Sequence, residues 1–148
     1  MFKRILIPTD GSKVADKAVK AGIRFAREIG AKVVGYCAVE PIPSSYYNSE
    51  GGIVDGRLIT ELDRQAIAAG EKTLAAMAKL ARTGRVRFDS LCDKPATASE
   101  GIVAAARRKK CDVIFMASHG RGGLAKLVMG SVTQKVLAHS KIPVVVYR

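Results

Sequence analysis

Residues 3–39 read KRILIPTDGSKVADKAVKAGIRFAREIGAKVVGYCAV, with an apolar run at each end and a helical pattern between them. The runs at 3–10 and 31–39 are short, and the second is almost continuously apolar, which is typical of strands buried on both faces of a sheet. Ser12 is a suitable N-cap for the intervening helix, and Gly30 is a suitable C-terminal stop. This stretch therefore predicts a βαβ unit, from which parallel sheets are built.

The remaining chain continues the alternation of strands and helices. The elements follow in the order helix 58–82, strand 85–92, helix 97–110, strand 111–118, helix 131–140 and strand 141–148. The strand at 85–92 begins with alternating basic and apolar residues, and a capping box at Thr97–Glu100 opens the helix that follows it. In the first of these helices the apolar residues lie on one helical stripe: Ile59, Leu62, Ala66, Leu74, Met77 and Ala81. Residues 40–57 contain two prolines and a Gly-Gly pair, so we expect a long loop there, a type of segment that often forms a lid or a binding segment.

This order of elements predicts one α/β domain over residues 1–148. We expect a doubly wound, Rossmann-like or flavodoxin-like arrangement, with a five-stranded parallel sheet in the strand order 3-2-1-4-5 and helices on both faces. The last strand, with IPVVVYR at its core, would then lie at an edge of the sheet, where an apolar strand favours pairing with a second chain.

The composition is that of a globular protein, with 48% hydrophobic and 26% charged residues. No segment approaches the roughly 18 apolar residues of a membrane span, and the first apolar run is too short for a signal peptide. We therefore expect a cytoplasmic protein that makes no membrane contact. Cys37, Cys92 and Cys111 are far apart in the sequence and lack metal-ligand spacing, so we interpret them as small apolar side chains.

The net charge is +12, from 25 Lys and Arg against 13 Asp and Glu. A surplus of this size favours polyanionic partners, which include nucleotides, nucleic acid and anionic lipid. Trp is absent and aromatic residues make up only 5%, so no stacking platform is predicted and specific nucleic-acid binding is disfavoured. The basic run 107–110 is interpreted as a solvated helix end that the helix dipole favours.

Residues 117–131, ASHGRGGLAKLVMGS, join a predicted strand to a predicted helix. In a doubly wound sheet this segment and Asp10 both follow the carboxyl ends of strands at the point where the winding reverses, which is where ligands bind. Its glycines at 120, 122 and 123 permit positive φ and a close approach of backbone N–H groups to phosphate oxygens. Gly130-Ser131 begins a helix whose N-terminus favours an anion. A capping box between Ser131 and Gln134 would explain Ser131 without any ligand.

Other nucleotide and hydrolase motifs fit less well. A P-loop is absent. The run from Gly120 to Ala125 matches a dinucleotide fingerprint, but no acidic residue follows Asp112 to hold a ribose, so we interpret the match as accidental. Ser118 and His119 beside Asp10 suggest a hydrolase, yet no second carboxylate lies nearby in the sequence to orient the imidazole. Asp10 is alternatively a turn residue at the helix entry.

The start ILIPTDGS and the last strand, loop, helix and strand resemble the universal stress protein family over essentially the whole chain. Its nucleotide-binding branch carries G-x2-G-x9-G-[ST], and the corresponding residues here are Ala117, Gly120, Gly130 and Ser131. Three of these four positions match, and Ala117 replaces the first glycine. If that position needed positive φ, the Cβ would cost on the order of 1 kcal/mol. We expect instead that the position needs only a small residue.

The resemblance implies a dimeric, ATP-binding stress-response or signalling module that binds its nucleotide and at most hydrolyses it slowly. It places Asp10 near the ribose or phosphates through Mg²⁺ or Mn²⁺, the backbone of Val39 against adenine, and the homodimer contact at strand 142–147. The complete set of implied nucleotide-binding residues is Pro8, Thr9, Asp10, Val39, Ala117, His119, Gly120, Arg121, Gly123, Gly130, Ser131, Val132 and Thr133. The loop 40–57 would be a lid beside the adenine. The alternative is a nucleotide-free dimer that acts through protein partners.

Overall fold

The computed structural model of the chain describes residues 1–42, 56–120 and 129–148. Its elements follow in the order β1 (Arg4–Pro8), α1 (Lys13–Ile29), β2 (Lys32–Ala38), α2 (Gly56–Thr83), β3 (Phe88–Asp93), α3 (Ala98–Arg108), β4 (Val113–Ala117), α4 (Ser131–His139) and β5 (Val144–Tyr147). The strands are all parallel and pair in the order β3-β2-β1-β4-β5. The predicted fold class and strand order are confirmed.

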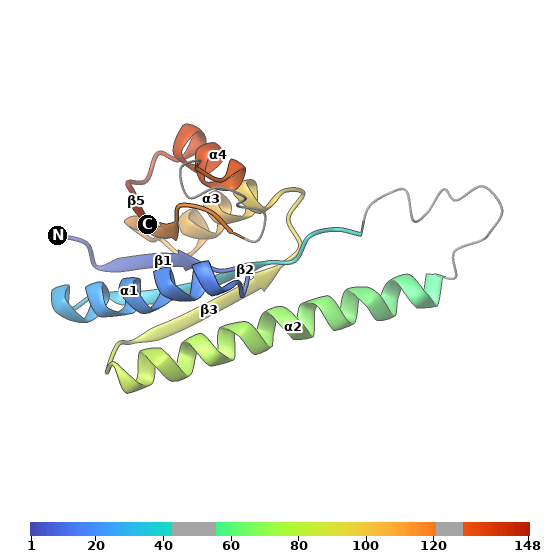
Figure 1. The fold of residues 1–148 in the computed structure, drawn as a ribbon, viewed down its shortest axis with the longest axis horizontal. Helices are drawn as coiled ribbons and strands as arrows, with labels where there is room; N and C mark the ends of the chain where they lie inside the picture. Colours follow the sequence, from blue (N-terminus) through green and yellow to red (C-terminus); the bar gives the residue numbers. More distant parts are fainter. Residues whose placement is uncertain (43–55, 121–128) are drawn as a thin grey trace.

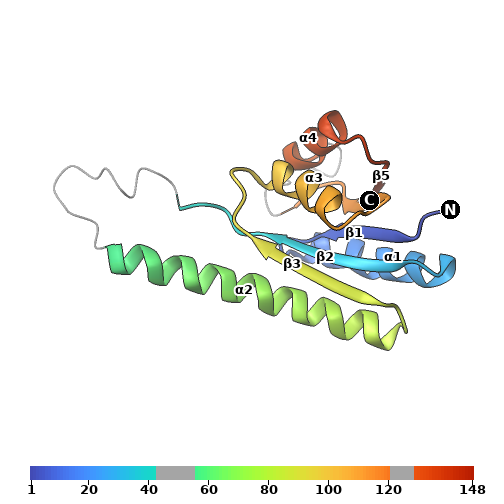
Figure 2. The same cartoon turned by 180° about the vertical axis from the view of Figure 1, so that it is seen from behind.

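Helices α1 and α2 cover one face of the sheet, and α3 and α4 cover the other (Figures 1 and 2). In β1 the side chains of Ile5 and Ile7 join the core under α1 and α2, whereas Leu6 joins the core under α3 and α4. All three are fully buried. Because both faces are covered, β1, β2 and β4 are apolar at successive interior positions instead of alternating, whereas β3 carries Asp89, Ser90 and Asp93.

The predicted caps of two helices form. Ser12 Oγ accepts the N–H of Ala15 at 3.2 Å, and Gly30 closes α1 in the left-handed conformation at φ 71°. Thr97 Oγ1 accepts the N–H of Glu100 at the start of α3. These caps satisfy backbone groups that would otherwise lack partners at the helix ends, so they set where α1 and α3 begin.

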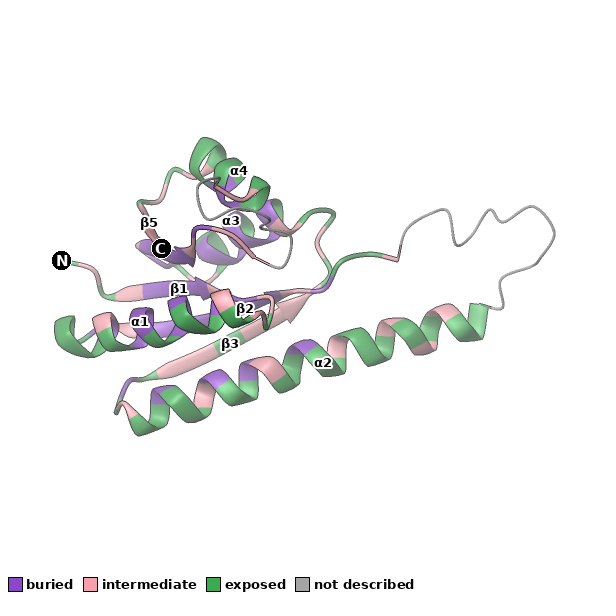
Figure 3. Cartoon of the chain, viewed as in Figure 1, coloured by how far each residue is buried: buried purple, intermediate pink, exposed green. Residues whose placement is uncertain are grey.

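Helix α2 differs from its prediction at its N-terminal end. It begins at Gly56, inside the segment expected to be loop, and its first half extends beyond the sheet (Figure 1). The apolar stripe is therefore buried only from Gly70 onward, while Leu62 is 40% exposed and Ala66 is exposed (Figure 3). The helix pattern is correct, but the sheet is shorter than the helix and covers only part of the stripe.

The parallel sheet has two chemically different edges. The carboxyl edge is where β1, β2, β3 and β4 end and where α1, α3 and α4 begin; the amino edge is where the strands begin and the last turns of the helices lie. The N-terminus and the last turns of α1 and α2 share one end of the molecule in Figure 1. No described helix is long and apolar enough to cross a membrane.

Candidate functional site

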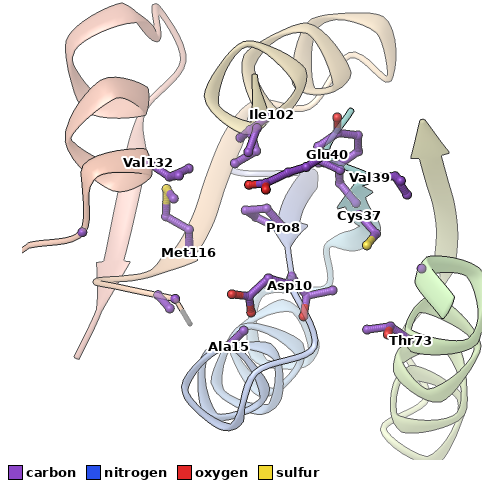
Figure 4. Close-up of a pocket in the computed structure, with 18 of the residues that line it drawn as sticks. Pro8, Asp10, Ala15, Cys37, Val39, Glu40, Thr73, Ile102, Met116 and Val132 are labelled. Carbon is purple, nitrogen blue, oxygen red and sulfur yellow. The ribbon is translucent and has the colours of Figure 1, made fainter. Parts of the chain in front are cut away.

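A cleft of about 680 Å³ opens at the carboxyl edge, between the starts of α1, α3 and α4 and the middle of α2 (Figure 4). The predicted site residues that line it are Pro8, Thr9, Asp10, Val39, Ala117, His119, Gly120, Gly130, Ser131, Val132 and Thr133. Arg121 and Gly123 lie outside the described residues, as does most of the proposed lid, 43–55. Segments more than 100 residues apart in the sequence therefore meet at one cleft, as the strand order requires.

Asp10 and Gly120 are in direct contact at the switch point between β1 and β4. One oxygen of Asp10, Oδ1, accepts the N–H of Ser12 at 2.9 Å. A Cβ on Gly120 would lie only 2.6 Å from the other oxygen, Oδ2. Glycine is needed here because of this close approach and not because of a left-handed backbone: among the described glycines only Gly11 and Gly30 have positive φ. Gly120 therefore does not use the positive φ that glycine permits.

The start of α4 also differs from its predicted chemistry. Gly130 is the N-cap and carries no side chain to cap the helix, and Ser131 is the first helical residue. The Gln134 side chain donates to the carbonyl oxygen of Met129 at 2.9 Å. The predicted capping box of Ser131 with Gln134 is therefore wrong, because the helix begins one residue earlier than that box requires. The Ser131 side chain, on an exposed residue, lines the cleft instead.

Contacts at the ends of β4 and α4 explain two small residues of the motif. A Cβ on Gly130 would lie 3.0 Å from the Cα of His119, so the two segments pack backbone against backbone. Ala117 is the last residue of β4, and positive φ does not occur there. Its carbonyl oxygen accepts the hydroxyl of Thr133 at 3.0 Å. The expectation that this position needs smallness and not positive φ agrees with the observed backbone.

The opposite end of the cleft is built on β2 and β3. Val39 is buried, and its backbone N–H donates to the carbonyl oxygen of Asp93 at 2.9 Å. The backbone group of Val39 that is left for a ligand is therefore its carbonyl oxygen, which accepts hydrogen bonds. Beneath it, the fully buried Tyr36 donates its hydroxyl to Asp93 Oδ1 at 2.7 Å, and Arg108 donates to Asp93 Oδ2 at 2.6 Å. Burial, and then this hydrogen bond, raise the pKa of Tyr36 well above its ordinary value. The phenol is therefore a structural donor.

Sequence reasoning missed the walls that α2 and α3 contribute. Gly70 and Thr73 of α2, Ile102 of α3 and Met116 of β4 line the cleft, and none belongs to a local motif. Figure 4 shows Thr73 and Ile102 on opposite sides of the cavity, and Val132 next to Met116. The signal that could have found the α2 wall is a set of small residues at helical spacing, which lets this face of the helix lie close to the cleft: Ala66, Ala69, Gly70 and Thr73.

The interpretation of the three cysteines as separate, small apolar side chains is incomplete, because two of them lie next to each other. Cys37 and Cys92, distant in the sequence, are register partners on the parallel strands β2 and β3. A Cβ on Gly70 would lie 3.2 Å from the Cys37 sulfur and 2.8 Å from the Cys92 sulfur, so the helix can approach both thiols only through a glycine. Cys37 lines the cleft. The remaining thiol, Cys111, is buried at the amino edge as an apolar side chain.

The described lining of the cleft carries two carboxylates, Asp10 and Glu40, and neither Lys nor Arg. In Figure 4 the Glu40 side chain extends over Pro8 toward the middle of the cavity. The described residues hold no cluster of three His, Cys, Asp or Glu that would form a metal cage. Carboxylate oxygens suit Mg²⁺ and Mn²⁺, and Mg²⁺ is commonly bound by one or two carboxylates together with phosphates of a ligand. Asp10 fits that second kind of site.

Ser118 and His119, the residues that suggest a hydrolase in the sequence, have a structural role and not a catalytic one. Ser118 Oγ lies 2.9 Å from His119 Nδ1, but Ser118 is 3% exposed. Its backbone N–H is donated to Tyr147 and its carbonyl accepts the N–H of Gly130. A nucleophile must reach its substrate, so this buried serine, which links the end of β5 to Gly130, does not suit attack on a ligand in the cleft.

The chain is similar to known proteins over its whole length. Residues 1–148 match the model of the Universal stress protein family. The chain is 33% identical over its full length to universal stress protein MJ0531 of Methanocaldococcus jannaschii, 83% of which is covered. It is 34% identical to a universal stress protein of Thermus aquaticus over the full length of both chains. Among solved structures, hypothetical protein MJ0577 superposes with a TM-score of 0.82 at 25% identity, over 99% of this chain and 95% of that one.

Two further solved structures contain adenine nucleotides. One is a universal stress protein in complex with cAMP, with a TM-score of 0.71 at 20% identity over 99% of this chain and 97% of that one. The other is the universal stress protein of Archaeoglobus fulgidus in complex with dAMP, with a TM-score of 0.68 at 15% identity over 100% and 98%. At these identities the likeness shows the common fold. With the match of the family model over every residue, the chain belongs to the universal stress protein family.

Proposed function

We propose that the carboxyl-edge cleft binds an adenine nucleotide, with ATP and Mg²⁺ or Mn²⁺ as the native ligand. The observation that carries this proposal is the contact between Asp10 and Gly120 beside the start of α4, which no side-chain cap closes. A phosphate chain with a bound metal ion requires a carboxylate for the metal, backbone that a ligand can approach closely and a helix N-terminus for the phosphates, and this cleft has all three. The cAMP and dAMP complexes of two structural neighbours support the same class of ligand.

Each part of the nucleotide has a proposed partner. The backbone N–H groups of Ser131, Val132 and Thr133 in the first turn of α4 hold phosphate oxygens, since they point along the positive end of the helix dipole. The carbonyl of Val39 accepts the amino group of adenine. Asp10 holds the metal ion, which neutralises phosphate charge in a described lining without Lys or Arg. The further lining residues Pro8, Thr9, Ala117, His119, Gly120 and Gly130 shape the cleft around the sugar and phosphates.

We assign binding, and not turnover, as the main act of this cleft, within a cytoplasmic stress-response or signalling module. The module is proposed to be a homodimer joined along β5. This strand is at an edge of the sheet, and each of its four residues, Val144–Tyr147, is only partly buried within one chain. Sedimentation of the purified chain tests the dimer: a monomer at all micromolar concentrations would contradict it.

Isothermal titration of nucleotide-stripped protein with MgATP tests the nucleotide site. Wild type is expected to bind and to melt at higher temperature with ligand. Gly120→Ala is expected to bind at least about tenfold more weakly, because the added methyl must displace the Asp10 carboxylate. Gly56→Ala is the matched control, since a Cβ there meets nothing within 4 Å. Absence of both heat and thermal protection for wild type would contradict the proposal.

The second candidate function is a nucleotide-free module that acts through protein partners. The alanine at position 117, where the nucleotide-binding motif has glycine, is the observation that favours it. Mass spectrometry of small molecules that co-purify with the protein separates the two candidates. An adenine nucleotide at near-stoichiometric amount supports the first, and a ligand-free protein that does not bind MgATP supports the second.

A further inference from the structure

A group of exposed cations lies at the amino edge, away from the cleft. Six exposed cations lie at the last turns of α1, α2 and α3 and at the turns and strand starts that follow: Arg27, Arg82, Arg85, Arg87, Arg107 and Lys110. We call this set the basic edge. None of the six forms an ion pair with a described residue.

Backbone hydrogen bonds fix the turns that carry several residues of the basic edge. The N–H of Arg85 is donated to the carbonyl of Arg82, and the N–H of Lys110 is donated to the carbonyl of Arg107. The carbonyl of Arg87 accepts the N–H of Val33, which ties the start of β3 to β2. The turns after α2 and α3 and the start of β3 are thus held at the amino edge.

Two acidic residues near this edge, Asp89 and Asp112, are already occupied, whereas Glu28 in the last turn of α1 is exposed. Asp89 lies 3.7 Å from the ammonium of Lys32 and 3.2 Å from that of Lys109. Asp112 accepts the backbone N–H groups of Lys3 and Arg4, at 2.8 and 3.1 Å. Asp89 and Asp112 therefore neutralise other groups, and the six cations together with Glu28 leave a net charge of +5 (6 − 1) facing solvent.

Two of the six cations occupy strained backbone. Arg85 has φ 55° and Lys110 has φ 53°, and they are the non-glycine residues with positive φ in the described chain. The corresponding turn after α1 has Gly30, at φ 71°. Left-handed backbone disfavours residues with a Cβ. The helix dipole explains cations in the last turns, such as Arg82 and Arg107, but Arg85, Arg87 and Lys110 lie beyond the helix ends.

We propose that the basic edge binds the phosphate backbone of double-stranded nucleic acid without reading its sequence. Neighbouring strands are about 4.8 Å apart, so the starts of β3, β2, β1 and β4 span roughly 15 Å. A duplex carries one charge per about 1.7 Å of axis with both strands counted, so a segment of that length carries about nine phosphates around its circumference, and only those on the near face meet the six cations.

A duplex suits this surface better than a single strand. Single-strand binding relies on aromatic side chains that stack with bases. Phe2, Phe25 and Phe88, the aromatic residues near this edge, pack against the core under α1 and α2. The edge therefore offers charge without stacking, which is sufficient for backbone contact.

The test is fluorescence anisotropy of the full-length protein with two unrelated 20-bp DNA duplexes over a range of salt concentrations. Six phosphate contacts predict a slope of log K against log salt of about −5, so affinity falls about 10³-fold between 50 and 200 mM salt. Both duplexes are expected to bind equally. Saturating MgATP is expected to leave DNA binding unchanged, because the cleft lies at the other edge.

The decisive variant is Arg85→Asn with Lys110→Asn, because asparagine tolerates left-handed backbone. Its melting temperature is expected to be equal or higher, while the salt slope decreases by about two. Lys72→Gln with Lys135→Gln removes the same charge from exposed helix positions elsewhere and is expected to keep the slope. Asp89→Asn, which removes a negative charge from the edge, is expected to strengthen DNA binding.

Several outcomes overturn the proposal. Equal weakening by the double variant and by its control would mean that net charge alone attracts DNA. Competition by MgATP would place the DNA in the cleft. Absence of binding at 50 mM salt would remove the surface altogether. Tighter binding to vesicles that contain phosphatidylserine than to DNA, lost in the double variant, would assign the edge to a membrane.

Discussion

The two edges of one sheet present opposite chemistry. At the carboxyl edge the cleft is lined by small and apolar residues, backbone and two carboxylates, and its described lining contains neither Lys nor Arg. At the amino edge six exposed cations stand without acidic partners among the described residues. The described lining of the proposed nucleotide site therefore contributes no cation to the net charge of +12. A surplus of charge in a sequence does not show where an anion binds.

Helix dipoles give the physical reason. In this fold α1, α3 and α4 begin at the carboxyl edge, and the helices end at the amino edge. Partial positive charge at helix N-termini attracts anions without cationic side chains, and partial negative charge at C-termini stabilises Lys and Arg there. The carboxyl edge thus attracts anions at short range through oriented backbone, and the amino edge attracts them at longer range through side-chain charge.

Salt gives the largest expected contrast between the edges. MgATP affinity is expected to change by less than about tenfold between 50 and 200 mM salt, because contacts in a cleft at short range are screened little. DNA affinity is expected to fall about 10³-fold over the same range. Calorimetry and anisotropy on one protein preparation measure both. Equal salt dependence of the two ligands would remove the distinction.

Thiol reactivity gives a second contrast, because each edge contains a cysteine. Burial raises the pKa of Cys111, at the amino edge, to about 11, which lowers its thiolate fraction at neutral pH about 100-fold relative to an ordinary thiol. Cys111 is therefore expected to resist iodoacetamide in the native protein. Cys37 lines the cleft, and its alkylation is expected to slow when MgATP binds. Peptide mass spectrometry measures both rates; protection of Cys111 instead of Cys37 by MgATP would contradict the placement of the ligand.

Tolerance of added volume should also differ between the edges. A Cβ on Gly101, beside the cleft, would collide with the Tyr36 hydroxyl and lie 2.6 Å from Cγ of Pro95. Gly101→Ala is expected to destabilise the fold by about 1–3 kcal/mol in urea unfolding. Gly84→Ala, near the amino edge, has contacts no shorter than 3.4 Å and is expected to cost less. The comparison fails if the two variants unfold at the same urea concentration.

The smallest expected effect concerns pH at the amino edge. Burial tends to raise the pKa of Asp89, but hydrogen bonds from Lys109 and the Ser90 N–H, with the charges of Lys109 and Lys32, hold it below its ordinary value. Because the folded pKa is the lower one, the stabilisation is present above the unfolded pKa near 3.9 and is lost as pH falls through the folded value. Asp89→Asn is therefore expected to be less stable than wild type at pH 6, with a smaller difference at pH 3. A difference that stays constant over this range would contradict it.

Much of the fold could be predicted because its signals are local. Ser12, Gly30 and Thr97 determine helix ends within a few residues of themselves, and continuous apolar runs indicate strands covered on both faces. The motif residues of the cleft also could be found, since G-x2-G-x9-G-[ST] describes a single loop. Ser131 shows the limit of local rules: it fits a capping box, yet the N-cap is Gly130, which packs against the backbone of His119, and Ser131 is the first helical residue.

The sequence by itself determined the order of the elements, the parallel sheet and the small residues at the switch point, because periodicity, caps and turn chemistry act over short distances. Only the tertiary structure decided which distant groups meet: Gly120 with Asp10, Gly70 with Cys37 and Cys92, and the cations of three helix ends along one edge. The tertiary structure also decided how much of α2 the sheet covers. These placements depend on strand order and register, which bring together residues that no local pattern relates.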